Sequence, residues 1–402
     1  MSSASSGPVR IGVVGLGMAG SEILRSLADM PEVEIAAVAS SRPEARAAFK
    51  ENFGGESHTT FDELCRNPNI DAVWVATPSE YHAEHAIKLA QHGKHIVMEK
   101  PFAITMNECE RMIRAAEDNK VTLIAGGSHS FNPSYLSMRE IVISGRLGGL
   151  AALADWAFTG WMLSPREPHE VDPSRDGGEL WNQGPHPIDA LRLLGGGMVR
   201  SVRGMTVDTN LRGRPCPGYF CAYIEFDDGT PATLVYNGYG YMNGWELVGW
   251  GETEQRLKNM ERPYEYRRRL REGIEDEYPA RENARYGSSS GGYQRGNAGW
   301  TPNSPGNVVV TCERGEIRQS ERGLYVYDDF GRHDEPFSIE GNVRTQEAME
   351  LVRALRGEPI FRDGRWGMAT LEVVNAIAES ARTRKDVMLR CQVPVPEGSL
   401  AR

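Results

Sequence analysis

The glycine-rich segment Gly15-Leu-Gly17-Met-Ala-Gly20 constrains the fold of this chain more than any other feature. It directly follows a buried-strand run that begins at Val9, and it opens a stretch, 18–28, in which apolar residues recur with helical spacing. A GxGxxG motif between a strand and a helix is typical of a site that binds a dinucleotide. In such a site Gly15 makes the tight turn, Gly17 lets the backbone approach the diphosphate, and Gly20 lets helix and strand pack closely.

Short apolar runs alternate with helical patterns over the first 125 residues. The patterns predict strands at 9–15, 33–39, 72–76, 95–98 and 121–125, and helices at 18–28, 44–50, 82–91 and 106–119. Alternation of this kind favours an α/β fold with a doubly wound parallel sheet. We therefore assign residues 9–127 to a Rossmann domain that binds NAD(P).

The pattern changes after about residue 150. Longer strands are predicted at 150–158, 199–208, 219–226, 232–239, 308–313, 316–319 and 324–327. They favour an α+β domain with an open, mainly antiparallel sheet over 128–362, interrupted by a charged and then Gly-rich insertion at 252–306. The segment 363–390 contains an amphipathic helix, expected to pack back near the Rossmann domain. Residues 1–8 are expected to form a disordered tail.

Length and charge exclude several classes of protein. With 402 residues, and about 150 residues for a typical domain, two or three domains are expected. A net charge of −10 argues against partners that need a basic face, such as nucleic acid or an anionic membrane. No run approaches the roughly 18 apolar residues of a membrane span, and the first residues lack the organisation of a signal peptide. A cytoplasmic enzyme acting on a small molecule is expected.

Neither the cysteines nor the histidines suggest a metal site. The six cysteines form no CxxC pair and have no regular spacing, so neither a zinc site nor a disulfide framework is predicted. His82, His85, His92 and His95 lie around one predicted helix and the following strand. We interpret them as structural histidines and expect no metal.

The end of the second predicted strand indicates which nicotinamide nucleotide is used. NAD sites usually place Asp or Glu about 20 residues beyond the last glycine of the motif. Here Ser40, Ser41 and Arg42 occupy that place, so no carboxylate is available to repel a 2′-phosphate. Arg42 favours NADP over NAD, since it can pair with that phosphate or stack on adenine. It is equally consistent with a solvated residue that begins a helix before Pro43.

Two further strand ends carry polar residues. Thr77, Pro78 and His82 follow the strand at 72–76, and Glu99 and Lys100 follow the strand at 95–98. Open α/β sheets bind their ligands at the carboxyl ends of the strands. The chain has only 7 lysines among its 45 basic residues. A lysine in this place therefore predicts a functional role.

With these residues in place, the chain resembles the Gfo/Idh/MocA oxidoreductases. The matching residues are the glycine motif, Thr77, Pro78, His82, Glu99, Lys100, Pro101 and the block 177–189, which contains Asn182, His186 and Asp189. The resemblance implies that Lys100 and His186 flank a nicotinamide and that Lys100 precedes a cis peptide. It implies that the nucleotide is surrounded by residues of the glycine turn and of three strand ends: Gly15, Gly17, Met18, Ala19, Gly20, Ser40, Ser41, Arg42, Thr77, Pro78, His82, Glu99 and Lys100. It also implies a homodimer or homotetramer that pairs through the open sheet face.

One position departs from the family pattern. Many members carry Asp four residues before the histidine, where this chain has Asn182, which can hydrogen-bond a hydroxyl but cannot take its proton. We therefore expect His186 to be the base, with an ordinary pKa near 6.5, and Lys100 to stabilise the developing alkoxide. Asp189 either supports His186 or is a first-turn carboxylate of a helix that begins with Pro187.

Other segments are similar to the phthalate 4,5-cis-dihydrodiol (4,5-dihydroxyphthalate) dehydrogenase-like branch. These are 165–172, Gln183, 192–197, the charged insertion, 311–314 and 363–372. That branch implies oxidation of a ring diol to a catechol, with Arg166 available for a substrate carboxylate and Gln183, Trp161 and Asp189 near the substrate. Trp156, Trp161 and Trp181 either stack on a ring substrate or pack on a sheet face.

Three alternatives stay open at this point. The first is a sugar or glycoside C3 dehydrogenase that uses the same Lys100 and His186. The second is redox-assisted cleavage of a glycoside with tightly held NAD. The third is a non-catalytic nucleotide sensor, against which the presence of Lys100 and His186 argues.

Overall fold

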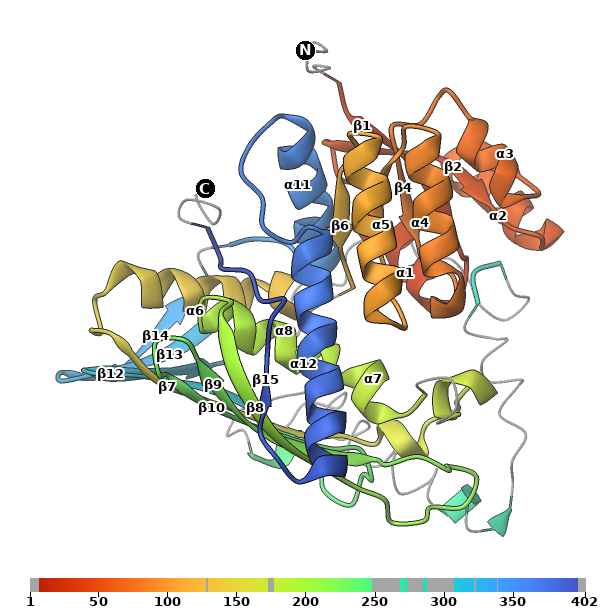
Figure 1. Cartoon of the computed structure of the whole chain (residues 1–402). Coiled ribbons are helices and arrows are strands. Elements are labelled where there is room, and N and C mark those ends of the chain that lie inside the picture. The colour runs from red at the N-terminus through yellow and green to blue at the C-terminus, as the bar shows by residue number, and fades with distance from the viewer. Residues whose placement is uncertain are drawn as a thin grey trace.

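The chain folds around two β-sheets that lie one above the other in Figure 1. This computed structural model describes residues 7–127, 129–172, 177–247, 268–270, 272–273, 285–287, 307–321, 323–337 and 339–396. The upper sheet is built from the first third of the chain, and the lower sheet from residues after 149. The structure confirms the predicted fold class: a Rossmann domain followed by a domain with a mainly antiparallel sheet.

The first sheet has six parallel strands in the order β3-β2-β1-β4-β5-β6. This order is that of a doubly wound dinucleotide-binding sheet. Its strands are β1 (Val9–Val14), β2 (Val33–Ala39), β3 (Glu56–His58), β4 (Ala72–Val75), β5 (His95–Met98) and β6 (Leu123–Ala125). Its helices are α1 (Met18–Leu27), α2 (Pro43–Phe53), α3 (Phe61–Arg66), α4 (His82–Gln91) and α5 (Met106–Asp118). Sequence analysis missed β3 and α3, because three polar residues and a six-residue helix carry no clear periodicity.

Strand β4 shows why both faces of this sheet are covered. Val73 and Val75 belong to the apolar cluster that includes α4 and α5, whereas Ala72 and Trp74 belong to the cluster that includes α1 and α2. Successive side chains of a strand point to opposite faces, so a strand with only apolar residues has to be buried on both. All four of these side chains are inaccessible to solvent.

The second sheet has nine strands in the order β14-β13-β12-β11-β7-β10-β9-β8-β15. Its strands are β7 (Leu150–Phe158), β8 (Val199–Val207), β9 (Tyr219–Phe226), β10 (Pro231–Asn237), β11 (Asn307–Cys312), β12 (Gly315–Gln319), β13 (Gly323–Asp328), β14 (Gly331–Pro336) and β15 (Val387–Met388). All neighbouring pairs are antiparallel except β7 and β10, which run parallel. The sheet is thus mixed. Polar β14 was not predicted, since it has no apolar alternation.

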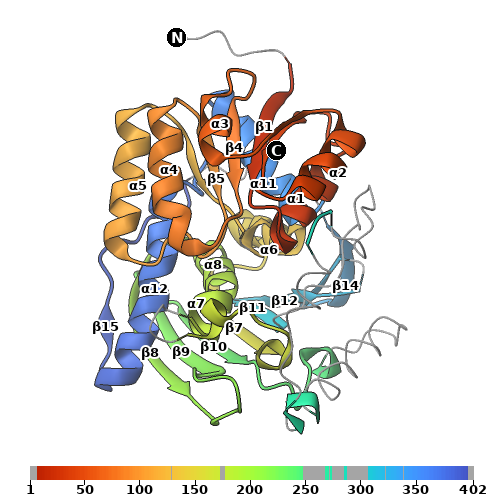
Figure 2. The same cartoon turned by 90° about the vertical axis from the view of Figure 1, so that its right-hand side faces the viewer.

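One face of the second sheet carries helices that lie between the two sheets (Figure 2). They are α6 (Pro133–Ser144), α7 (Glu179–Gln183) and α8 (Pro185–Leu194), with the long α12 (Gly364–Thr383) along one side. Helix α12 contacts β8 of the second sheet as well as α5 and β6 of the first. It therefore ties the two domains together. The opposite face of the sheet leaves the Trp156 side chain half exposed.

The structure corrects the expected domain organisation at one helix. Helix α11 (Val343–Leu355) falls inside 128–362, yet it packs against α1, and its Ala348, Leu351 and Val352 join the apolar cluster of the Rossmann sheet. Apart from the three short stretches within 268–287, the insertion predicted at 252–306 lies outside the described residues, as does most of the tail at 1–8.

Three features hold across the described ranges. No helix there is both long and apolar enough to cross a membrane. No group of three or more His, Cys, Asp or Glu side chains there is arranged to hold a metal ion. The six cysteines are all free thiols.

Candidate active site

The glycine motif forms the turn between β1 and α1. Gly15 adopts φ +90°, and a Cβ there would overlap the backbone of Ala76. A Cβ on Gly20 would overlap the carbonyl oxygen of Gly15, so helix and turn are packed as closely as glycine permits. Gly17, in contrast, has no atom within 4 Å of where its Cβ would stand. That open space lies at the N-terminus of α1, where free N–H groups and the helix dipole favour an anion.

The other predicted nucleotide residues lie at the same edge. Met18 is 46% exposed and Ala19 is half-buried beside it in the first turn of α1. Ser40 and Ser41 follow β2, and the Ser40 Oγ accepts a hydrogen bond from the Arg42 N–H at 3.2 Å. The guanidinium of Arg42 donates to the Leu16 carbonyl at 2.8 Å and to the Tyr286 carbonyl at 2.9 Å. Arg42 therefore lies against the glycine turn and is held by main-chain oxygens.

The loop after β4 is organised by His82. Its Nδ1 lies 2.9 Å from the Pro101 carbonyl oxygen, and its Nε2 lies 2.9 Å from the Thr77 carbonyl oxygen. The ring is 1% exposed, and burial lowers its pKa. The ring joins the strand-end loop of Thr77 and Pro78 to the loop that contains Lys100 and Pro101. The Thr77 hydroxyl lies 3.1 Å from the ring of His85, while Pro78 is exposed at the loop surface.

The remaining histidines of this region also bond to protein groups. His85 packs on Phe61, with ring centroids 4.0 Å apart, and burial lowers its pKa to about 4. His92 Nδ1 lies 2.9 Å from the Lys88 carbonyl oxygen, and His95 Nδ1 accepts from the Thr122 N–H at 2.9 Å. These contacts are those of structural histidines.

Lys100 joins the two domains. It follows β5, and its peptide bond to Pro101 is cis, as the resemblance implied. Its Nζ donates to the main-chain oxygen of Asn182 at 3.1 Å and to Asn182 Oδ1 at 3.2 Å. Burial is the main cause that lowers the pKa of Lys100 to about 8, against the opposing charges of Glu99 and Glu170. The amine therefore changes charge close to neutral pH.

Asn182 and Gln183 extend this contact into the second domain. Gln183 Nε2 donates to Asn182 Oδ1 at 2.8 Å, and Gln183 Oε1 accepts from the Tyr236 hydroxyl at 3.2 Å. The Asn182 oxygen that was expected to bond a substrate hydroxyl thus already accepts from two side chains. Its role in this arrangement is to place the Lys100 amine.

His186 lies at the start of α8 and stacks on His129. The two ring centroids are 4.0 Å apart and the ring planes differ by 20°. His186 is 8% exposed, and burial together with the nearby His129, Lys100 and Arg344 lowers its pKa well below 6.5. This corrects the expectation of an ordinary imidazole pKa. Burial and these cations favour the neutral form of the ring, in which one ring nitrogen has a free lone pair.

Glu99 pairs with a cation that comes from a distant helix. Its side chain is 5% exposed and pairs with Nη1 of Arg344, which comes from α11. The same nitrogen lies 3.0 Å from Glu347, and Glu347 in turn accepts the Gly127 N–H at 2.6 Å. These buried groups connect the loops after β5 and β6 to a helix more than 200 residues later in the chain.

Asp189 does not support His186. Helix α8 begins at Pro185 rather than at Pro187, so Asp189 is already past its first turn. The carboxylate is 3% exposed and accepts hydrogen bonds from Trp366 Nε1 and, at 3.0 Å, from Thr370 Oγ1. Its function is to fasten α8 to α12, which corrects its assignment as a substrate residue.

Arg166 and Trp161 lie together beside a hollow of about 420 Å³. The Arg166 guanidinium stacks on the Trp161 ring at 4.1 Å from its centroid and lies 3.5 Å from Glu170. Arg214 lines the same hollow and donates to three main-chain oxygens. Arg166 is also one of the cations whose charge lowers the pKa of Lys100.

The other two tryptophans lie away from this hollow. Trp156 is 51% exposed on the open sheet face, and Trp181 Nε1 donates to Asn375 of α12 at 3.3 Å. Of the three tryptophans, Trp161 is therefore the one placed to stack on a ring substrate.

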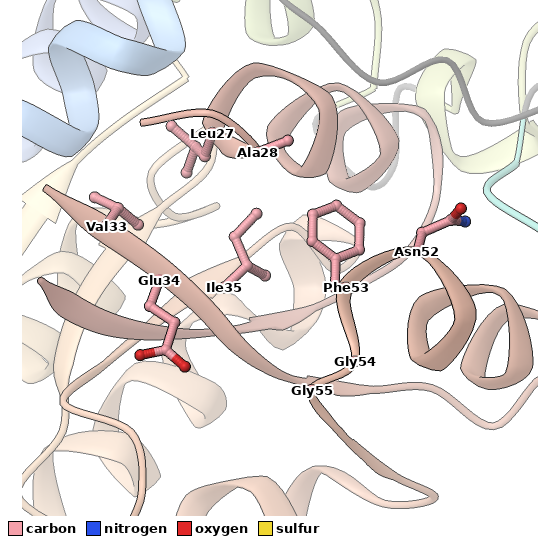
Figure 3. Close-up of a pocket in the computed structure, with 9 residues that line it drawn as sticks. All are labelled: Leu27, Ala28, Val33, Glu34, Ile35, Asn52, Phe53, Gly54 and Gly55. Carbon is pink, nitrogen blue, oxygen red and sulfur yellow. The ribbon is translucent and has the colours of Figure 1, made fainter. Parts of the chain in front are cut away.

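A second hollow, of about 300 Å³, lies between α1, β2 and α2. Figure 3 shows the apolar side chains of Leu27, Val33, Ile35 and Phe53 gathered there, with Glu34 directed away from them. Residues 33–35 begin β2, so this hollow is at the opposite edge of the sheet from the glycine turn. It is no part of the candidate active site.

Several residues of the site were missed by sequence analysis. They are His129, Tyr236, Arg344 and Glu347. His129 could have been found, because it follows β6 as Lys100 follows β5. The others carry no sequence signal, since each comes from a part of the chain that only the fold brings to the site.

The residues present fit a nicotinamide dinucleotide. A glycine turn with open space at a helix N-terminus suits a diphosphate, and Lys100 follows a strand at the same sheet edge, with its charge acting on the buried His186 of α8. Fold and site together define an NAD(P)-dependent oxidoreductase.

Comparison with known proteins gives the family. Residues 9–127 match the model of the oxidoreductase family with an NAD-binding Rossmann fold, and residues 135–251 match the GFO/IDH/MocA C-terminal domain. The chain belongs to the Gfo/Idh/MocA family of oxidoreductases.

Three relatives show the range of similarity. The 1-carboxy-3-chloro-3,4-dihydroxycyclohexa-1,5-diene dehydrogenase of Comamonas testosteroni is 30% identical over 93% of this chain and 95% of its own length. The dTDP-3,4-didehydro-2,6-dideoxy-alpha-D-glucose 3-reductase of Streptomyces violaceoruber is 30% identical over 60% of this chain and 70% of its own. A crystal structure from Bordetella bronchiseptica RB50, assigned as a dehydrogenase, superposes with a TM-score of 0.86 at 31% identity, covering 95% of this chain and 100% of that one.

Proposed function

We propose that this protein oxidises a cis-dihydrodiol of a carboxylated ring by hydride transfer to a nicotinamide nucleotide. The observation that carries the proposal is the pair of guanidinium groups, Arg166 and Arg214, that line one hollow. The charge of Arg166 also acts on Lys100. Guanidinium groups bind carboxylates with two parallel hydrogen bonds. The Comamonas testosteroni relative, which acts on a carboxylated dihydroxycyclohexadiene, supports the same substrate class.

The reaction uses the two neighbouring groups differently. His186, neutral at physiological pH, accepts the proton of the substrate hydroxyl. Lys100 in its charged form donates a hydrogen bond to the oxygen as negative charge develops on it. Asn182 holds the amine in place through both of its oxygens. The bound nicotinamide supplies the acceptor for the hydride.

The coenzyme preference follows from the end of β2. Ser40 and Ser41 leave no carboxylate to repel a 2′-phosphate, and Arg42 lies against the glycine turn. We therefore propose NADP as the preferred nucleotide. Arg42→Ala is expected to weaken NADPH binding and leave NADH binding unchanged, as measured by nucleotide fluorescence. Equal effects on both nucleotides would contradict this preference.

A sugar substrate is the second candidate. The Streptomyces violaceoruber relative is a reductase of a deoxysugar nucleotide, and a sugar hydroxyl needs the same acid–base pair. A sugar without a carboxylate has no use for Arg166, which separates the two candidates.

The deciding experiment is a substrate screen with both nucleotides. Carboxylated cis-dihydrodiols, the same diols without the carboxylate, and glycosides are each tested by nicotinamide absorbance. We expect turnover of the carboxylated diols, and expect Arg166→Met to raise their KM by about 10- to 100-fold, as for the loss of a charged hydrogen bond. Arg66→Met, on the exposed surface of α3, is the matched control. Turnover of glycosides alone would rule the proposal out.

We also propose that two or four copies pair through the open face of the second sheet. Trp156, Val235, Cys221 and Met205 lie in register across four strands of that face. Trp156 and Met205 are 51% and 43% exposed, an unusual arrangement for a face left in water. Light scattering is expected to show a monomer for Trp156→Glu but not for Phe330→Glu, a control at the tip of the β13–β14 hairpin.

The six free thiols favour the reducing cytoplasm as the place where the protein works.

A further inference from the structure

His129 lies at the reaction centre without an assigned role. It follows β6, so it comes from the third neighbouring strand end of the sheet, beside those that carry Thr77 and Lys100. Its ring lies face to face with that of His186, with 4.0 Å between centroids and 20° between planes. Two flat rings at this distance and angle restrict each other's rotation.

Within the described residues, Nδ1 of His186 is without the hydrogen bond that normally orients a reactive imidazole. A histidine used in catalysis or metal binding usually donates its second ring nitrogen to a carboxylate or carbonyl, which fixes the plane of the ring. Here Nδ1 of His186 is buried and has no hydrogen-bond partner in the described part of the chain. The nearest carboxylate on its helix, Asp189, is engaged with α12 instead. The orientation of the ring must come from packing.

The surroundings keep both stacked rings uncharged. The titratable and charged groups that act on them are Lys100 after β5 and Arg344 on α11, in addition to the rings themselves. Burial is the main cause that lowers the pKa of His129 to about 3, and the positive charges of Lys100 and Arg344 act in the same direction. Stacking is therefore not opposed by repulsion between two imidazolium ions at physiological pH.

The position of His129 is itself fixed by the neighbouring backbone. The Gly127 N–H, two residues earlier, donates to Glu347 at 2.6 Å. Gly127 has φ +72°, and a Cβ there would overlap both the Glu99 carboxylate and the Lys100 N–H. The chain that leads to His129 thus packs directly on the chain that leads to Lys100, with Arg344 closing the group by pairing with Glu99 and Glu347.

We propose that His129 is a positioning residue whose stacked ring holds the His186 imidazole in the orientation needed to accept the substrate proton. The acceptor role of His186 rests on the proposed function, whereas the stacking does not. His129 acts through the face of its ring, so a flat ring without nitrogen atoms can replace it. Its own Nδ1 is also buried and has no partner in the described residues, as expected if no ring hydrogen bond is used.

The test compares His129→Phe with His129→Ala. Phenylalanine keeps a flat ring, and alanine removes it. We expect His129→Ala to lower kcat at least about tenfold, because a misplaced group costs this much or more, with nucleotide binding unchanged. His129→Phe is expected to keep kcat within about threefold of the unsubstituted enzyme. His92→Phe and His92→Ala, at the exposed end of α4, are matched controls expected to change nothing.

A second readout needs neither substrate nor nucleotide. The imidazole proton resonances of His186 in the free enzyme carry the ring-current shift of the stacked neighbour. This shift is expected to persist in His129→Phe and to vanish in His129→Ala. Failure of the dihydrodiol screen leaves this result unaffected, so the two proposals fail separately.

Two outcomes would overturn the inference. If both substitutions lower kcat equally, a ring nitrogen of His129 is required and the stack is not its function. If neither substitution changes kcat or the His186 resonances, His129 has no part in placing His186.

Discussion

Lys100 Nζ donates to both oxygens of Asn182, at 3.1 Å to the main chain and 3.2 Å to the side chain. The first residue ends a strand of the Rossmann sheet, and the second lies on α7 of the other domain. The reactive amine is therefore placed by both domains, and its position depends on how they pack.

Removal of the amine is expected to abolish turnover and spare nucleotide binding. Lys100→Met should lower kcat by about 10²- to 10³-fold, the usual cost of losing one donor to a developing oxyanion. The affinity for NAD(P)H, measured by fluorescence, should stay unchanged because the glycine turn is intact. Normal turnover by Lys100→Met would refute the role of the amine.

The pH dependence follows from the charge of Lys100. Its pKa is lowered to about 8, chiefly by burial, so the charged form that stabilises the alkoxide is lost as the pH rises through 8. We expect kcat/KM for oxidation to fall above this pH. No loss is expected between pH 6 and 7, because the pKa of His186 lies well below 6.5. A rate that instead rises through pH 8 would identify neutral Lys100 as the proton acceptor.

Asn182→Asp tests whether the fall of kcat/KM above pH 8 reports on Lys100. A carboxylate next to the amine favours its charged form, so the pKa of Lys100 should increase by about 1 to 2 units. The basic limb of the kcat/KM profile should move up by the same amount. If kcat/KM of this variant falls at the same pH as before, the fall does not report on the charge of Lys100.

Gly17 and Gly20 are expected to respond differently to alanine. A Cβ on Gly17 meets no protein atom, so Gly17→Ala should leave the melting temperature unchanged while it blocks the approach of the diphosphate. Gly20→Ala overlaps the Gly15 carbonyl and should lower the melting temperature as well. Calorimetry and nucleotide titration on both variants distinguish the two effects. Equal loss of stability in both variants would contradict the assignment of Gly17 to the approach of the diphosphate and of Gly20 to the packing of helix and turn.

Arg344 is expected to contribute to the free energy of unfolding. Arg344→Met leaves Glu99 and Glu347 buried without their cation, which typically costs about 3–5 kcal/mol in the free energy of unfolding. Urea denaturation measures this loss. Arg356→Met, at the exposed end of the same helix, is the control and should cost less than about 0.5 kcal/mol. Similar stabilities for the two variants would show that the buried ion pairs are dispensable.

The strands and the glycine turn were predictable from local sequence. Strands such as β2 and β5 are mostly apolar, with Glu34 and His95 as their polar residues. Their bounds agree with the prediction because the pattern of each element is complete within it. β3 and β14 were missed because they are polar edge strands, held by backbone pairing rather than by an apolar pattern. Lys100 was found through its place at a strand end, since such ends converge on one edge of a parallel sheet.

Tertiary structure decided the partners of these residues. The sequence determined a Rossmann domain and an open second sheet, because each follows from patterns within a few residues of one another. The pairing of Lys100 with His186 was expected from the family resemblance. It could not place Arg344 beside Glu99, Asp189 against Trp366, or His129 on His186, since these contacts join segments from 57 to 245 residues apart. Nor could it show the neutral state of His186. Burial and neighbouring charge set a pKa, and both arise only when distant segments pack around the same group.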